Sequence, residues 1–112
     1  MAGTQFPTRV GGVASITAGT TQTQAGATEA TGSTNIVTTG NANDGVVLTA
    51  RNPGDTVYII NTSAVALKVY PPSGAAINGG SANAAVVAKA NSTTAFVCGS
   101  STVWGGVIDT TV

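Results

Sequence analysis

Turn residues punctuate this chain at short intervals, and this punctuation restricts the fold more than any other feature. From Gly32 onward, short runs rich in Val, Ile, Thr and aromatic residues alternate with clusters of Gly, Asn, Pro and Ser. Such runs are typical of β-strands joined by tight turns. Helix formers are scarce, with two Leu, two Lys, two Arg, one Glu and one Met in 112 residues. The sequence therefore predicts an all-β protein.

The stretch from residue 53 to residue 79 carries the clearest strand pattern. Residues 55–61 are β-branched and aromatic, and residues 66–70 alternate Leu and Val with Lys and Tyr. A period of two is what a half-buried strand requires. Pro-Gly-Asp precedes the first run and Pro-Pro-Ser-Gly follows the second, as expected of turns. We interpret the stretch as a hairpin-like pair of strands around which the fold is organised.

About seven runs have strand character. They are residues 34–39, 46–50, 55–61, 66–70, 86–89, 93–98 and 103–108. The pattern predicts one domain over residues 32–112, a small antiparallel β-sandwich or a jelly-roll-like barrel. Residues 1–31 hold few bulky anchors and are predicted to form an extended N-terminal arm, with one helical turn at residues 25–30. The alternative for this segment is a disordered tail.

Charge limits the partners that the chain can have. Charged residues are 7% of the sequence, and the formal net charge is zero. The four cations are scattered, so no nucleic-acid partner is expected. No apolar run approaches the ~20 residues of a membrane-spanning helix, and no secretory signal is visible. A small β-rich domain with few charges is marginal alone and leaves its sheet edges unprotected, so we expect a homo-oligomer.

The sequence lacks the residues that most catalytic sites use. It has no His, which removes Ser-His-Asp and Cys-His arrangements. Its single Cys, Cys98, is interpreted as a buried and inert thiol, with a reactive thiol or an intermolecular bridge as alternatives. Four acids are spread along the chain, and Asp44 and Asp55 are predicted turn residues. We therefore expect no enzyme activity, no metal and no cofactor.

Aromatic residues supply the bulk of the predicted core. Phe96 lies in an alternating run, on the same face as Thr94 and Cys98, and Trp104 is the second residue of the last predicted strand. Both are expected to be buried. Trp104 also allows a second interpretation, because it adjoins a Gly-Ser-Ser-Thr loop and a Trp ring can stack on a sugar; Tyr70 allows the same interpretation.

Part of the chain resembles a known group of proteins. The run Val69-Tyr70-Pro71-Pro72-Ser73-Gly74-Ala75-Ala76-Ile77-Asn78-Gly79 and its surroundings, over roughly residues 34 to 104, are similar to small structural proteins of tailed bacteriophages. The resemblance implies an all-β protein on the virion, either a capsid decoration (cement) protein or a module of a fibre. It implies the major capsid protein as partner, a homotrimer, and a place on the capsid surface.

Between these two settings, we expect the decoration protein. The sequence begins with Met and holds only an arm and one domain, whereas a fibre module is normally attached to a long shaft. A decoration protein would bridge neighbouring capsid subunits through its arm, for which Phe6, Pro7, Arg9 and Val10 are the candidate contacts. The alternative is a fibre or receptor-binding module that recognises a host cell-surface glycan.

Overall fold

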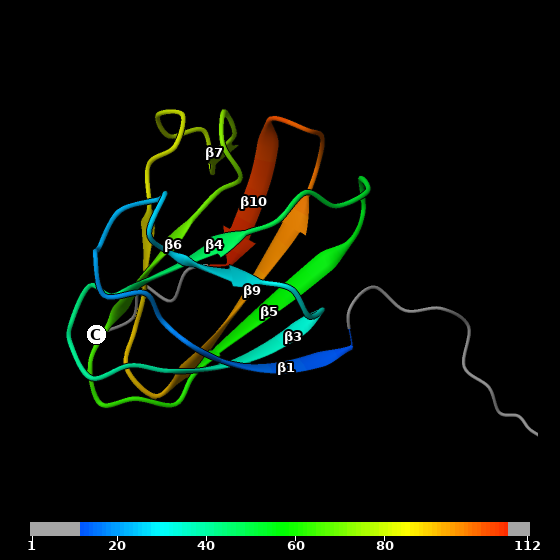
Figure 1. The fold of residues 1–112 in the computed structure, drawn as a ribbon. Coiled ribbons are helices and arrows are strands. Elements are labelled where there is room, and N and C mark those ends of the chain that lie inside the picture. Colours follow the sequence, from blue (N-terminus) through cyan, green and yellow to red (C-terminus); the bar gives the residue numbers. More distant parts are fainter. Residues whose placement is uncertain (1–11, 108–112) are drawn as a thin grey trace, which may run out of the picture.

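The computed structural model describes residues 12–107, which form ten β-strands in two packed sheets (Figure 1). The strands are β1 (Val13–Thr17), β2 (Thr28–Ala30), β3 (Thr34–Thr38), β4 (Gly45–Leu48), β5 (Thr56–Asn61), β6 (Leu67–Tyr70), β7 (Ala76–Ile77), β8 (Val86–Ala88), β9 (Ser92–Cys98) and β10 (Val103–Val107). This part of the chain contains no helix, and hence none that could cross a membrane. The all-β prediction is confirmed.

The first six strands alternate between the sheets. The larger sheet has the order β1-β3-β5-β9-β10-β7 and the smaller has the order β2-β4-β6-β8. Strands β1, β3 and β5 are parallel to one another, as are β2, β4 and β6. The chain crosses to the opposite sheet after each of these strands (Figure 1). Residues 13–70 therefore form three stacked two-strand coils, the arrangement of a short β-solenoid.

The last strands reverse this direction. β8 runs antiparallel to β6, and β9 runs antiparallel to both β5 and β10, so that β9 lies inside the larger sheet. A short parallel pairing of β10 with β7 completes that sheet. The predicted antiparallel sandwich is therefore wrong for the first six strands. Turn residues indicate where a strand ends, but they do not indicate whether the chain turns back or crosses the core.

The stretch from residue 53 to residue 79 illustrates the difference. Its two predicted strands exist as β5 and β6, but they lie in different sheets and form no hairpin. Asn61, which is buried, accounts for the crossing: its Nδ2 donates to the carbonyl of Val65 at 2.9 Å, and its Oδ1 accepts from the N–H of Ser63 at 3.0 Å. These hydrogen bonds hold the connection after β5 in a turn that leads away from the six-stranded sheet.

Residues 12–30 contain more regular structure than the sequence suggested. The seven predicted runs correspond to β3, β4, β5, β6, β8, β9 and β10, whereas β1, β2 and β7 were not among them. Residues 25–30 contain β2 and no helical turn, so that prediction is wrong. Because β1 and β2 pair within the two sheets, residues 13–30 belong to the first coil and not to a separate arm. Residues 1–11, the rest of the predicted arm, lie outside the described residues.

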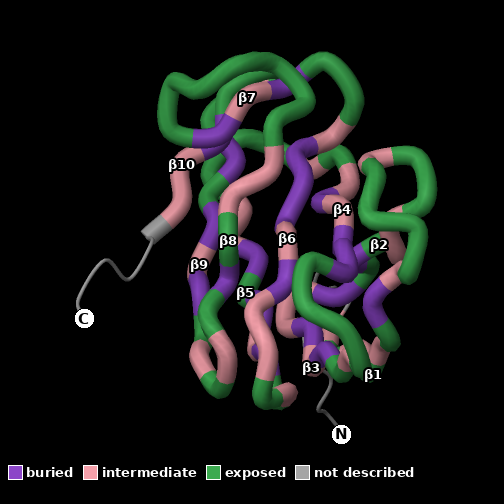
Figure 2. The backbone as a smooth tube through the Cα atoms, turned by 90° about the vertical axis from the view of Figure 1, so that its left-hand side faces the viewer, coloured by how far each residue is buried: buried purple, intermediate pink, exposed green. Residues whose placement is uncertain are grey.

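The core fills the space between the sheets, and buried positions alternate with less buried ones along most of the strands (Figure 2). Its largest buried side chains are Trp104 and Phe96, as predicted. At the first coil two of the inward residues are small: Ala18 and Ala30 are both buried, whereas Ile16 packs against the core while partly buried. The small side chains allow the sheets to approach each other closely there. The hydroxyl of Thr28 also joins the sheets, by donating to the carbonyl of Thr17 at 2.6 Å.

Candidate functional site

The outer face of the six-stranded sheet is the most distinctive surface of the described residues. We call it the uncharged face and define it by the outward-facing residues of β1, β3, β5 and β9 and the start of β10. These are Val13, Ser15, Thr17, Thr34, Ile36, Thr38, Thr56, Tyr58, Ile60, Thr93, Ala95, Val97 and Val103. Every one is apolar or a hydroxyl residue, so the face offers an approaching protein no charge to desolvate.

The strand register explains how this face is assembled. Tyr58 on the central strand β5 is flanked by Thr34 of β3 on one side and by Ala95 of β9 on the other. Thr34 is in turn paired with Val13 of β1. Each strand alternates inward and outward, so this row points away from the core in register. The result is a ridge of apolar and β-branched side chains across the sheet, with the Tyr58 ring near its middle.

Exposed hydrophobic residues concentrate on this face. The large hydrophobic side chains that are exposed within the described residues are Val13, Tyr58, Val87, Val97 and Val103. All but Val87 belong to the uncharged face. Tyr58 is 44% exposed and Val13 is 70% exposed. Exposed apolar residues that gather on one face in this way are typical of interaction sites on proteins.

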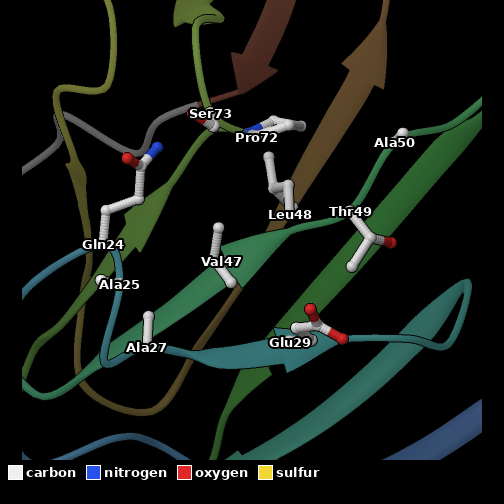
Figure 3. Close-up of a pocket in the computed structure, with 10 residues that line it drawn as sticks. All are labelled: Gln24, Ala25, Ala27, Glu29, Val47, Leu48, Thr49, Ala50, Pro72 and Ser73. Carbon is white, nitrogen blue, oxygen red and sulfur yellow. The ribbon is translucent and has the colours of Figure 1, made fainter.

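A shallow hollow of about 460 Å³ lies on the other sheet, over β4 (Figure 3). Val47 and Leu48 contribute to its floor, and Gln24 and Pro72 stand at its rim. The rim is fixed because Gln24 Nε2 donates to the carbonyl of Pro71 at 2.8 Å. The lining contains one ionisable group, Glu29, and therefore no acid–base pair. The hollow can accept a small apolar side chain, and among the described residues that line it Glu29 has no second titratable group beside it with which to form an acid–base pair.

The charged residues of the described chain do not form a reactive cluster. Within residues 12–107, no three His, Cys, Asp or Glu side chains are placed to hold one metal ion. Asp44 is buried and accepts a hydrogen bond from the hydroxyl of Thr39, and Asp55 accepts one from the N–H of Asn52. Both acids therefore hold turns, as predicted. Cys98 is also buried, which agrees with the interpretation of an inert thiol.

The aromatic residues proposed for sugar stacking are not available for it. Trp104 is 1% exposed and Tyr70 is 7% exposed. The hydroxyl of Tyr70 donates to the carbonyl of Gln22 at 2.9 Å, so its polar end is also occupied. The interpretation of either ring as a stacking platform is therefore wrong. The predicted contact residues Phe6, Pro7, Arg9 and Val10 lie outside the described residues.

Sequence reasoning missed the uncharged face. Tyr58 and Ile60 alternate with Val57 and Ile59, which suggested that both sides of β5 were covered. Val57 and Ile59 are indeed buried, and β5 does lie inside its sheet, but the side that holds Tyr58 is open within the described chain. The available signal was the coincidence of outward apolar residues in several strands. It could not be used without the strand register.

Comparisons with protein families, with curated proteins and with solved structures gave no match to this chain.

Proposed function

We propose that this protein is a structural protein of a phage virion: a capsid decoration protein that stabilises the head by bridging neighbouring capsid subunits. The observation that supports the proposal is the uncharged face, which gathers the exposed Val13, Tyr58, Val97 and Val103 on one sheet. A rigid sheet with such a face is suited to adhesion, because burying apolar surface contributes about 25 cal/mol per Å² without requiring charged partners.

In this proposal two parts of the chain share the contact. The uncharged face lies against one capsid subunit, and the N-terminal residues Phe6, Pro7, Arg9 and Val10 reach a neighbouring subunit. Attachment through two linked contacts raises the overall affinity, since the second contact forms at a high effective concentration. The proposed protein acts as a homo-oligomer on the capsid surface. The phage resemblance implies a trimer, whereas the open edge of β1 points to a two-fold pairing.

A binding assay with purified capsids that lack the protein tests the proposal. We expect the unaltered protein to co-sediment with capsids and Tyr58→Lys to bind at least about tenfold more weakly, because a charge would be buried in an apolar contact. Val87→Lys is the matched control, since Val87 is similarly exposed but lies on the other sheet. Removal of residues 1–11 is expected to weaken binding as well.

Two results would contradict the proposal. The first is full binding by a protein that combines Tyr58→Lys with the N-terminal deletion. The second is a low copy number at the tail of purified particles, measured by quantitative mass spectrometry. A decoration protein would instead be present in hundreds of copies on the head.

The alternative is a fibre or receptor-binding module that recognises a host glycan. One observation favours it: the exposed ring of Tyr58 lies on a face with several Thr hydroxyls, and aromatic rings with neighbouring hydroxyls suit sugars. Calorimetric titration with polysaccharide from the host surface separates the two functions. Binding that disappears in Tyr58→Ala supports the glycan function, whereas absence of glycan binding together with capsid binding supports decoration.

A further inference from the structure

Strand β1 forms one edge of the six-stranded sheet, and it differs from the other sheet edges of the described chain. It pairs with β3 alone and has five residues, VASIT, without a charge or a proline. The other edge strands are short: β7 has two residues, and β2 and β8 have three each. β2 also carries Glu29. Long, uncharged edge strands pair readily with other strands, whereas short or charged ones do not.

The hydrogen bonds of β1 identify the main-chain groups that remain open. The carbonyl of Gly12 accepts from β3 at 3.0 Å, and the N–H of Ala18 donates to β3 at 2.9 Å. In a parallel strand each residue directs both its N–H and its C=O to one side, and alternate residues use opposite sides. Val13, Ser15 and Thr17 therefore direct their main-chain groups away from β3, along the open edge.

We propose that this edge is a dimer interface, in which β1 pairs antiparallel with β1 of a second copy around a two-fold axis through Ser15. In this register Ser15 lies opposite Ser15 of the second copy, and Val13 lies opposite Thr17. Val13 and Ser15 present open N–H and C=O groups and Thr17 an open N–H, so the opposed pairs can form about four hydrogen bonds from open groups. The carbonyl of Thr17 already accepts from the hydroxyl of Thr28 at 2.6 Å, and it can accept from the second copy only through its other lone pair. The register thus uses the whole open edge.

The edge is self-complementary, which is why a second copy is the occupant. A two-fold interface brings each surface against itself, so like charges within it would repel, and β1 carries none. The opposed side chains are small or β-branched, and β-branched cross-strand pairs are favourable. The two-fold axis is perpendicular to the sheet, so the uncharged faces of both copies lie on the same side. Dimerisation requires no capsid, and the inference therefore stands independently of the proposed function.

Light scattering on a sizing column, over a range of protein concentrations, tests the proposal with the full chain. We expect a dimer for the unaltered protein and a dissociation constant at least about tenfold higher for Ser15→Pro. The N–H of Ser15 is on the open edge, so proline removes a donor of the interface without breaking the bonds between β1 and β3. Ser15→Thr keeps the donor and is expected to dimerise normally. Circular dichroism reports whether each variant folds.

Charged substitutions of Ser15, the residue on the two-fold axis, give a second test that does not depend on proline. Ser15→Lys and Ser15→Glu each place two like charges opposite each other, so each is expected to be a monomer. An equimolar mixture of the two is expected to form a heterodimer, with a salt-sensitive affinity. A monomeric unaltered protein would overturn the proposal. So would a dimer or a trimer that persists in Ser15→Pro and in both charged variants.

Discussion

Thr39 donates its hydroxyl to Oδ2 of Asp44 at 2.5 Å, while Oδ1 of this buried carboxylate has no hydrogen-bond partner in the described chain. Asp44 thus depends on a single side-chain donor. We expect Thr39→Val to lower the free energy of unfolding by about 2 kcal/mol, because hydrogen bonds to charged groups are worth about 1.5–3 kcal/mol.

Chemical denaturation of a double-mutant cycle measures this dependence, because Thr39 also contacts the main chain of Asn41. The cost of Thr39→Val is expected to be smaller by about 1–2 kcal/mol in the Asp44→Ala background. Equal costs in both backgrounds would show that the hydroxyl acts through Asn41 alone.

A second prediction concerns the loop between β1 and β2, which Tyr70 ties to the third coil. The hydroxyl of Tyr70 donates a hydrogen bond to the carbonyl of Gln22, which lies 48 residues earlier in the sequence. Tyr70→Phe keeps the ring and removes this bond, with an expected loss of about 1 kcal/mol in the free energy of unfolding. Tyr58→Phe is the matched control: Tyr58 is exposed, and no change is expected. A loss of equal size in both variants would contradict the assignment.

Close approach of the sheets at the first coil leads to a third prediction. Ala30 is fully buried there, so Ala30→Leu would force the sheets apart, and overpacking typically costs about 1–3 kcal/mol. We expect its thermal midpoint to fall relative to that of Ala84→Leu, in which the same change is made at an exposed position. An unchanged midpoint for Ala30→Leu would mean that space for larger side chains exists between these strands.

Cys98 provides a fourth prediction. It is buried in β9, and its Sγ lies 3.5 Å from the carbonyl of Arg51 and 3.4 Å from that of Ser100. Reaction with a thiol reagent requires unfolding, so modification of the native protein is expected to be at least about a thousandfold slower than in denaturant. Rapid labelling under native conditions would instead support the reactive-thiol alternative.

Residue pattern predicted most strands and the centre of the core, because alternation of side chains is a local property. Phe96, Thr94 and Cys98 share the buried face of β9 as expected. The pattern did not predict which strands pair. The turn after β5 could lead either back into a hairpin or across the core to the other sheet. The side chain of Asn61 selects the crossing through hydrogen bonds to residues further along the chain, which a local pattern does not contain. β1 and β2 were missed because Ala and Thr give a weak apolar signal.

The uncharged face could not be predicted from the sequence, for the same reason. Each strand contributes at most three outward residues, and single exposed apolar residues are ordinary. Tyr58 and Val13 become part of one surface only when β3 lies between their strands. For Trp104 the core prediction was correct, and only the alternative of sugar stacking, which its neighbouring loop had suggested, was wrong, because the pairing of β10 with β7 and β9 buries the ring.

The position of β9 between β5 and β10 also bears on how the chain is made. A ribosome synthesises the three parallel coils first, but β5 remains an edge of the growing sheet until residues 92–98 arrive to pair with it. Until then Val57 and Ile59 lack Phe96 and Trp104 as core partners. A nascent chain that stalls before residue 92 therefore exposes a long apolar edge, and its escape from aggregation depends on how quickly the last strands emerge.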